Sequence, residues 1–237
     1  MASTAPEIDG AHHNENNLIE GNYRMEAEFW HQKWEKNDIG FHREEANPLL
    51  VDHFDALNLS QGSRVFLPLC GKTRDIAWLL SQGHRVAGAE LSTLAVTQLF
   101  EELGIKPDVV DAGALTHYRS EALNLFLGDI FDLEQEQLGP VDAIYDRAAL
   151  VALPEALRLH YSEHLTRITE CAPQLLITYE YDQTVIDGPP FSVSSEEVLL
   201  HYGSQYTPML LHSQEVPGGM KGMCPAKEHL WLLKNSR

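Results

Sequence analysis

One stretch of the sequence and one acidic residue downstream constrain the fold more than any other feature. The apolar run that begins at Val65 stops at Gly71, and a helical pattern starts directly afterwards. A second apolar run, His84 to Ala89, ends on Glu90, about 20 positions after Gly71. This spacing predicts a β-α-β unit whose first turn lets a ligand approach the backbone, with an acid where nucleotide-type cofactors place their ribose. The chain is therefore expected to be a cofactor-binding α/β protein.

The composition is that of an ordinary soluble globular domain, with 43% hydrophobic and 22% charged residues among 237. The net charge of −18 argues against a nucleic-acid partner, since no cluster of Lys and Arg could neutralise a phosphate track. It argues equally against an anionic membrane surface, and no apolar run approaches the length of a membrane span. We expect neither nucleic acid nor a membrane as a partner.

The cysteines and histidines predict no metal site and no disulfide framework. Cys70, Cys171 and Cys224 are far apart and form no CxxC pair, which fits a reducing cytoplasm best. His160 and His164 have the helical spacing of metal ligands, but no third ligand is evident. Cys70 has no base near it in the sequence, so nucleophilic catalysis by its thiol is not expected.

The first 24 residues differ from the rest of the chain. They are polar, rich in Asn and Glu, and lack both a periodic apolar face and the features of a secretory signal. We expect a disordered or added leader over residues 1–24 and one domain over residues 25–237, with Met25 as the natural start.

From Met25 onward, helical and strand patterns alternate, which predicts a mostly parallel sheet covered by helices on both faces. Two late apolar stretches, 209–212 and 229–233, predict a closing antiparallel hairpin. Strands are expected at 64–69, 84–89, 108–110, 123–127, 143–145 and 175–181, and helices at 26–36, from 48, and at 73–82, 92–104, 154–169 and 194–202.

The turn at Gly71 matches neither of the two common phosphate-binding loops. Gly71–Thr73 ends like a P-loop, but Phe66 stands where that motif needs its first glycine. In the dinucleotide fingerprint with Gly71 as its middle glycine, Leu69 and Arg74 replace the other two. The backbone then has less room near a pyrophosphate, so a cofactor without one is favoured.

Two acidic residues follow predicted strands at the carboxyl edge of the sheet. The Glu90 carboxylate can accept hydrogen bonds from both ribose hydroxyls of an adenosine, although an acid there can also be a solvated loop residue. Asp129 can accept from the adenine amino group, with Ile130 as an apolar wall, although Gly128–Asp129 can also form a turn for backbone reasons alone.

A basic residue and two aromatic residues complete the set of candidates. Arg147 follows the strand at 143–145 and can recognise an anionic or electron-rich group, or form an ion pair with Asp146 or Glu180. Trp34 and Phe41 flank a loop before the sheet, where they can serve packing or close over a cofactor and face a sulfonium cation.

Together these motifs resemble the thiopurine S-methyltransferase family, especially its bacterial members. The resemblance extends from about Glu26 to Trp231. The matching stretches are EFWHQKW (28–34), GFHREE (40–45), VFLPLCGK (65–72), GHRVAGAELS (83–92), DIFDL (129–133), YDRAALVALP (145–154) and GPPFSV (188–193).

The resemblance implies a class I, Rossmann-like methyltransferase fold with a seven-stranded sheet, and S-adenosylmethionine as cofactor. It also implies that Phe41 and Arg147 face and position the acceptor. The sequence contains no evident Ser/His or Cys/His couple, so no dedicated catalytic residue is expected. Asp129 stands where mammalian members have a serine. The residues that the resemblance places at the cofactor are Trp34, Leu69, Glu90, Asp129, Ile130 and Arg147.

The function expected from this resemblance is methyl transfer to the sulfur of small aromatic or heterocyclic thiols, thiopurines among them, by a cytoplasmic monomer. Selenium or tellurium species remain open as natural acceptors, because polarisable nucleophiles attack sulfonium carbon well. A non-catalytic module that binds an adenosyl ligand also remains open. A nicotinamide-dependent oxidoreductase is disfavoured by the missing glycines.

Overall fold

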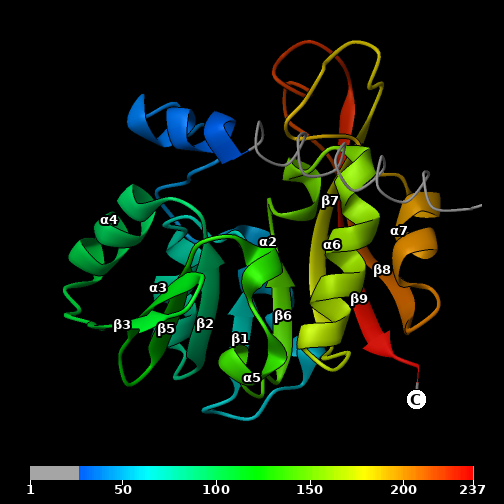
Figure 1. Cartoon of the computed structure of the whole chain (residues 1–237). Coiled ribbons are helices and arrows are strands. Elements are labelled where there is room, and N and C mark those ends of the chain that lie inside the picture. The colour runs from blue at the N-terminus through cyan, green and yellow to red at the C-terminus, as the bar shows by residue number, and fades with distance from the viewer. Residues whose placement is uncertain (1–26, 237) are drawn as a thin grey trace, which may run out of the picture.

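The structure, a computed structural model, describes residues 27–236, so the expected leader at residues 1–24 lies outside the described part. Within that part, one nine-stranded sheet has the order β3-β4-β5-β2-β1-β6-β7-β9-β8 (Figure 1). Strands β5, β2, β1, β6 and β7 run parallel, and β9 and β8 close the sheet antiparallel. The strands are β1 (Arg64–Leu67), β2 (Arg85–Glu90), β3 (Asp108–Ala112), β4 (Leu115–Arg119), β5 (Leu123–Leu127), β6 (Ala143–Asp146), β7 (Gln174–Tyr181), β8 (Tyr206–Glu215) and β9 (Ala226–Asn235).

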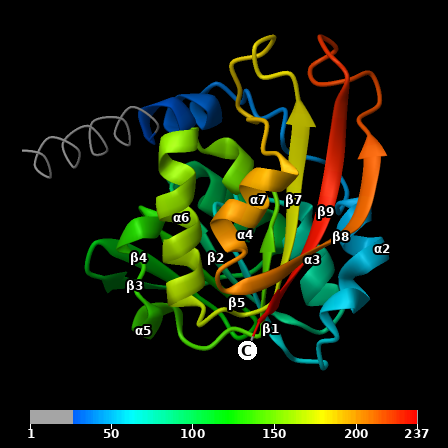
Figure 2. The same ribbon diagram turned by 90° about the vertical axis from the view of Figure 1, so that its right-hand side faces the viewer.

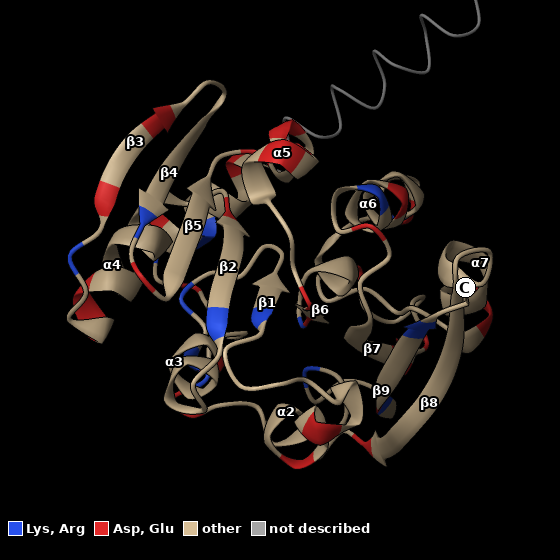
Figure 3. Ribbon diagram, turned by 90° about the horizontal axis from the view of Figure 1, so that it is seen from below, with Lys and Arg blue, Asp and Glu red and all other residues tan. Residues whose placement is uncertain are grey.

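Helices cover both faces of this sheet, as the sequence predicted. One face carries α2 (Pro48–His53), a 3-10 helix (Phe54–Leu57), α3 (Arg74–Ser81) and α4 (Thr93–Leu103). The other carries α5 (Gln135–Leu138), α6 (Glu155–Ile168) and α7 (Ser195–Tyr202). Figure 3 shows the two sets on opposite sides, with acidic residues on α2, α4 and α5. Two short 3-10 helices lie at Ile130–Asp132 and Leu150–Ala152, and residues 27–35 are helical as well.

The local signals at the helix ends work as the sequence indicates. The Asn47 side chain accepts a hydrogen bond from the Leu49 N–H, and Pro48 takes the first helical position of α2. Ser92 caps α4 in the same way, and Gly104 ends that helix in the left-handed conformation, with φ of +65°. The starts of α2 and α4 and the end of α4 are therefore set by local capping groups.

The sheet has nine strands instead of the expected seven, because an antiparallel hairpin extends one edge. Seven strands have the order β5-β2-β1-β6-β7-β9-β8, and β4 and β3 follow β5 at the edge. Strand β3 is the strand that the sequence predicted at 108–110. Strand β4 was not predicted, since Leu115–Arg119 is largely polar and only Leu115 is buried. A tight turn through Gly113, with φ of +82°, brings β3 back onto β4.

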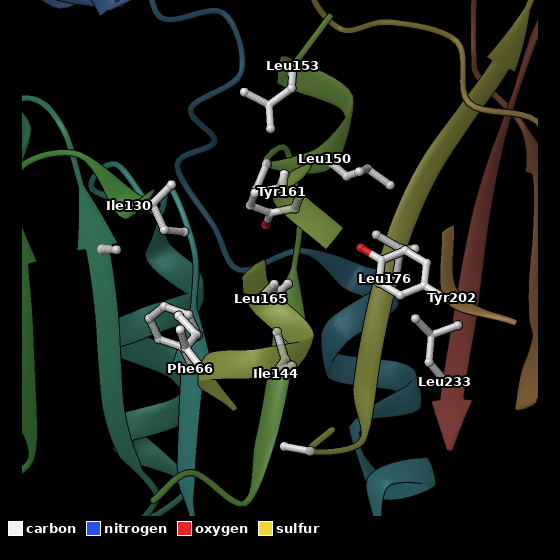
Figure 4. Close-up of a cluster of buried hydrophobic side chains, with 14 of the residues drawn as sticks. Phe66, Ile130, Ile144, Leu150, Leu153, Tyr161, Leu165, Leu176, Tyr202 and Leu233 are labelled. Atoms are coloured by element: carbon white, nitrogen blue, oxygen red, sulfur yellow. The ribbon is translucent and has the colours of Figure 1, made fainter. Parts of the chain in front are cut away.

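The core consists of two apolar layers, one on each face of the sheet. Figure 4 shows part of the layer beneath α6, where Phe66 and Ile144 of the central strands meet Leu165 of α6. Tyr161 and Tyr202 are fully buried in the same layer. Because both faces of β1 and β6 are covered, the ends of these strands are held rigidly in register.

The order of the strands creates a crevice at their carboxyl ends. Strand β1 lies between β2 and β6, and the chain crosses the sheet in opposite directions from there. Open α/β sheets bind their ligands at such a switch point. In Figures 1 and 2 the loops after β7 and between β8 and β9 rise on this side, together with the helical residues 27–35.

Asp146, the last residue of β6, connects the carboxyl end of this strand to α6 by hydrogen bonding. Its side chain is fully buried, and its Oδ2 accepts a hydrogen bond of 2.8 Å from the Tyr161 hydroxyl. Its Oδ1 accepts a bond of 3.1 Å from the Leu150 N–H. Burial raises the pKa of Asp146 from 3.8 to about 6, although these hydrogen bonds act in the opposite direction.

We predict that Asp146 makes the folded protein less stable as the pH rises from about 4 to about 6, because only the folded state holds this proton there. The gap between 3.8 and about 6 corresponds to about 3 kcal/mol at most. The free energy of unfolding of wild type minus that of Asp146→Asn should fall by up to this amount over that range. Urea titrations at several pH values measure it, with the exposed Asp52→Asn as control. A difference that does not vary with pH would contradict the prediction.

Candidate cofactor and acceptor site

A cavity of about 580 Å³ occupies the crevice at the carboxyl ends of the central strands. Its floor consists of the turn after β1, the end of β2 and the segment after β6. Its cover consists of the helical residues 27–34, the loop 38–43 and the loops at 188–190 and 216–221. The volume is that of a typical site for a small ligand.

Glu90 joins the two turns that form the floor. Its carboxylate is 6% exposed, and Oε2 accepts a hydrogen bond of 2.6 Å from the Gly71 N–H. The Ser92 N–H donates a bond of 2.8 Å to Oε1. Burial raises the pKa of Glu90, and these backbone donors lower it. A carboxylate has about four acceptor positions, so these hydrogen bonds do not use up its capacity to bind a ligand.

The turn after β1 has the unusual backbone that the close approach of a ligand requires. Gly71 has φ of +54°, and Leu69 has φ of +46°, a region that side chains of its type rarely adopt. Both residues line the cavity. A Cβ atom added to Gly71 would lie 3.0 Å from Cζ2 of Trp34, so the indole ring packs directly over the glycine.

The segment after β5 forms an apolar wall, but the Asp129 side chain does not line the cavity. Gly128, Ile130 and Phe131 line it, and Ile130 is buried. The Asp129 Oδ1 accepts a hydrogen bond of 2.8 Å from the Phe131 N–H and caps the short helix that follows. A contact between Asp129 and the adenine amino group stays a prediction.

Arg147 connects the floor to the cover. Its Nη2 donates a hydrogen bond of 2.9 Å to the Phe41 carbonyl oxygen, 106 positions away in the chain. The alternative of an ion pair with Asp146 or Glu180 finds no support, since neither pair is among those of the described residues.

Phe41 itself packs edge-on against Trp34 and Trp30, with ring centroids 5.7 Å and 5.6 Å apart. This aromatic cluster closes one side of the cavity. The structure therefore brings six of the seven predicted residues to one cavity. They are Trp34, Phe41, Leu69, Glu90, Ile130 and Arg147.

The lining of the cavity is cationic although the chain as a whole carries −18. Its only acidic residues among those described are Asp38 and Glu90. Five basic residues line it, namely Lys33, Arg43, Lys72, Arg147 and Lys221. Lys33 and Lys72 form ion pairs with Asp38 and Glu102, and the remaining excess of basic residues in the cleft favours an anionic ligand or reacting group.

Several residues of this lining were not predicted from the sequence. Tyr179 and the loop residues 216–221 come from the C-terminal third, and nothing near them in the sequence marks a site. The Gly188–Pro190 segment also lines the cavity and belongs to the GPPFSV motif, so that motif was a usable signal.

Cys70 was not expected to act as a nucleophile, and its surroundings can be described. Burial, with the Glu90 charge beside it, raises the pKa of the Cys70 thiol well above its usual value, which disfavours a thiolate nucleophile. Cys70 lies 2.9 Å from where a Cβ of Gly88 would be, so it fills a tight packing position.

Among the described residues, no three side chains of the metal-binding types gather as ligands. No helix in this part is long and apolar enough to cross a membrane.

Solved structures share this fold at low sequence identity. A SAM-dependent methyltransferase from Anabaena variabilis superposes with a TM-score of 0.59 at 18% identity and covers 88% of this chain and 94% of its own. The 1,6-didemethyltoxoflavin-N1-methyltransferase of Burkholderia thailandensis, solved with S-adenosylhomocysteine bound, gives 0.59 at 17% and covers 98% and 94%. The fold is that of the S-adenosylmethionine-dependent methyltransferases.

Sequence comparison identifies the family within this class. The thiopurine S-methyltransferase family matches residues 25–235. A protein of that name from Xanthobacter autotrophicus is 54% identical over 213 residues, which cover 90% of this chain and 100% of the relative. One from Gluconobacter oxydans is 48% identical over 208 residues, covering 88% and 94%. The chain belongs to the thiopurine S-methyltransferase family.

We predict that Gly71→Ala weakens cofactor binding by about tenfold or more. The positive φ of this residue is unfavourable for alanine, and the added Cβ would press against the Trp34 ring. Gly113→Ala is the matched control, since Gly113 has a positive φ too but nothing within 4 Å of the added atom. Both variants should lose about 1 kcal/mol of stability from the backbone conformation. Calorimetric titration with S-adenosylhomocysteine should separate them, and equal affinities would contradict the packing of Trp34 on the turn.

Proposed function

We propose that this protein transfers the methyl group of S-adenosylmethionine to the sulfur of small aromatic or heterocyclic thiols, thiopurines among them. Membership of the family supports this reaction. The observation that carries the proposal is the buried Glu90 carboxylate, which lines the cavity, holds the Gly71 turn and still has the capacity to bind a ligand.

The residues around Glu90 fit the cofactor. A buried carboxylate that lines the cavity and has more acceptor positions than backbone groups donating to it suits the hydroxyls of a ribose. Ile130 and Leu91 offer apolar walls to an adenine ring, and the Leu69 turn lies against the cavity. The bound cofactor supplies an electrophilic methyl group on a sulfonium sulfur. Asp129 is proposed to remain at the adenine end, as the resemblance implies.

The acceptor half of the site is proposed to lie under the cover. Arg147 would favour a thiolate over a thiol by charge, since its guanidinium lines the cavity. Phe41 would pack on the acceptor ring, and Trp34 and Trp30 behind it would exclude water. Positioning and charge then suffice for the transfer, because the cofactor already activates the methyl group.

The direct test is a methyl-transfer assay with isotopically labelled S-adenosylmethionine and a series of aromatic and heterocyclic thiols. The proposal expects labelled S-methyl products for thiols that fit the cavity. Cofactor binding without any transfer would instead favour a non-catalytic binding module. Parallel reactions with selenols and tellurite compare the other acceptor classes.

The finer aspects of the partner and the location are proposals too. The cavity volume of about 580 Å³ supports a small-molecule acceptor. The net charge of −18 supports a protein that does not bind nucleic acid. We propose that it acts as a monomer in the cytoplasm.

Glu90→Gln should weaken cofactor binding by about 10- to 150-fold, because hydrogen bonds to a charged group contribute about 1.5–3 kcal/mol. The melting temperature should also fall. The Gly71 and Ser92 amides donate to different oxygens of the carboxylate, and a glutamine side chain has only one acceptor oxygen in their place. Turnover at saturating cofactor should change little, because the ribose lies away from the transferred methyl group. Calorimetric titration measures the affinity, with the exposed Glu136→Gln as control. An unchanged affinity would refute the ribose contact.

Arg147→Lys should lower kcat/KM for the thiol by roughly tenfold or more. A guanidinium can donate to the Phe41 carbonyl and face the acceptor at the same time, whereas an ammonium is a point charge. Arg119→Lys, on the exposed strand β4, is the matched control. Steady-state kinetics with varied thiol give the result, and wild-type constants for Arg147→Lys would reduce Arg147 to a structural role.

A further inference from the structure

A phenol and a buried carboxylate lie side by side at the wall of the cavity. Tyr179 of β7 lines the cavity, and its hydroxyl donates a hydrogen bond of 3.0 Å to Oε1 of Glu228 on β9. The two residues are direct partners in the antiparallel pairing of these strands. The sheet therefore fixes their relative position at the wall of the cavity, which Tyr179 lines.

Glu228 lacks the cation that usually accompanies a buried carboxylate. It is 6% exposed, and its Oε2 accepts a hydrogen bond of 2.8 Å from the neutral Gln214 amide. None of the ion pairs among the described residues includes it. Both of its hydrogen-bond donors, the Tyr179 hydroxyl and the Gln214 amide, are neutral.

The Tyr179 oxygen can accept a hydrogen bond as well as donate one. Because its own O–H donates to Glu228, the lone pairs of its oxygen are free for a second partner. Burial and the Glu228 charge raise the pKa of Tyr179 to about 12, so the phenol keeps its proton at neutral pH. Arg147 lines the same cavity as Tyr179, and the charges of Arg147 and Arg43 act to lower the pKa of the phenol.

The other proton acceptors that line the cavity are less suitable. Glu90 is occupied by two backbone donors and assigned to the ribose, and Asp38 forms an exposed ion pair with Lys33. Burial and the charge of Lys72 lower the pKa of His42, so its protonated form is disfavoured. The pair of Tyr179 and Glu228 remains as the acceptor beside Arg147.

We propose that Tyr179 and Glu228 relay the proton of the thiol away before methyl transfer, an inference that rests on the proposed function. The S–H proton moves to Tyr179 Oη as the phenol proton moves to Glu228 Oε1, leaving a thiolate, a neutral phenol and a protonated carboxyl. The thiolate sulfur then forms the bond to the methyl carbon as the sulfonium–methyl bond breaks, and that electron pair stays on the former sulfonium sulfur. Glu228 afterwards returns its proton to water through Tyr179.

The relay matters only for acceptors that arrive protonated. The test compares 4-nitrothiophenol, which is ionised at neutral pH, with benzyl mercaptan, which is protonated there. Tyr179→Phe and Glu228→Gln should each lose at least about tenfold more kcat with benzyl mercaptan than with 4-nitrothiophenol, since general acid–base catalysis contributes about 10²–10⁴-fold. Cofactor affinity by calorimetry should stay at the wild-type value in both variants. Glu228→Gln carries the test if Tyr179→Phe does not fold.

Tyr181→Phe is the matched control, because it removes a phenol of the same strand whose hydroxyl donates to the Pro190 carbonyl oxygen at 2.6 Å instead of to a carboxylate. Its ratio of the two rates should equal that of wild type. If Tyr179→Phe and Glu228→Gln also keep the wild-type ratio while the wild type methylates both thiols, the relay is overturned and the proposed function stands. If the wild type methylates neither thiol, both are overturned.

Discussion

The contact between the Glu90 carboxylate and the Gly71 amide is the interaction on which the rest of the site depends. The turn after β1 adopts left-handed backbone at two residues, and an amide inside it needs a partner once the strand ends. Glu90 supplies that partner from the next strand and at the same time accepts from Ser92. One buried carboxylate therefore sets the shape of the floor and keeps acceptor positions for a ligand. Its desolvation is offset only while these donors stay in place.

Charge is distributed in two opposite ways in this protein. Acidic residues dominate the chain as a whole, whereas basic residues dominate the lining of the cavity. The field inside the cleft then favours the anionic form of an acceptor, and Arg147 places a cation where the proposed reaction needs a thiolate. Arg147 favours the ionised form of the acceptor sulfur, and Tyr179 and Glu228 are proposed to take up the proton that this sulfur loses.

Local sequence patterns were sufficient to predict the floor of the site. The apolar run ending at Gly71 and the spacing to Glu90 located the β-α-β unit, because both turns are encoded within a short stretch. The cover was less accessible, since the contact between Arg147 and Phe41 joins residues 106 positions apart. Tyr179 was missed for the same reason, because only the pairing of β7 with β9 places Glu228 beside it. Polar strand β4 lacks the apolar run by which strands are recognised.

The central claim is that Glu90 holds the Gly71 turn and a cofactor ribose at once. A crystal structure of the protein with S-adenosylhomocysteine tests it most directly. Both ribose hydroxyls should lie within about 3 Å of the Glu90 carboxylate oxygens, with the bonds from the Gly71 and Ser92 amides retained. A ribose bound elsewhere, or a Glu90 that touches only those two amides, would contradict it.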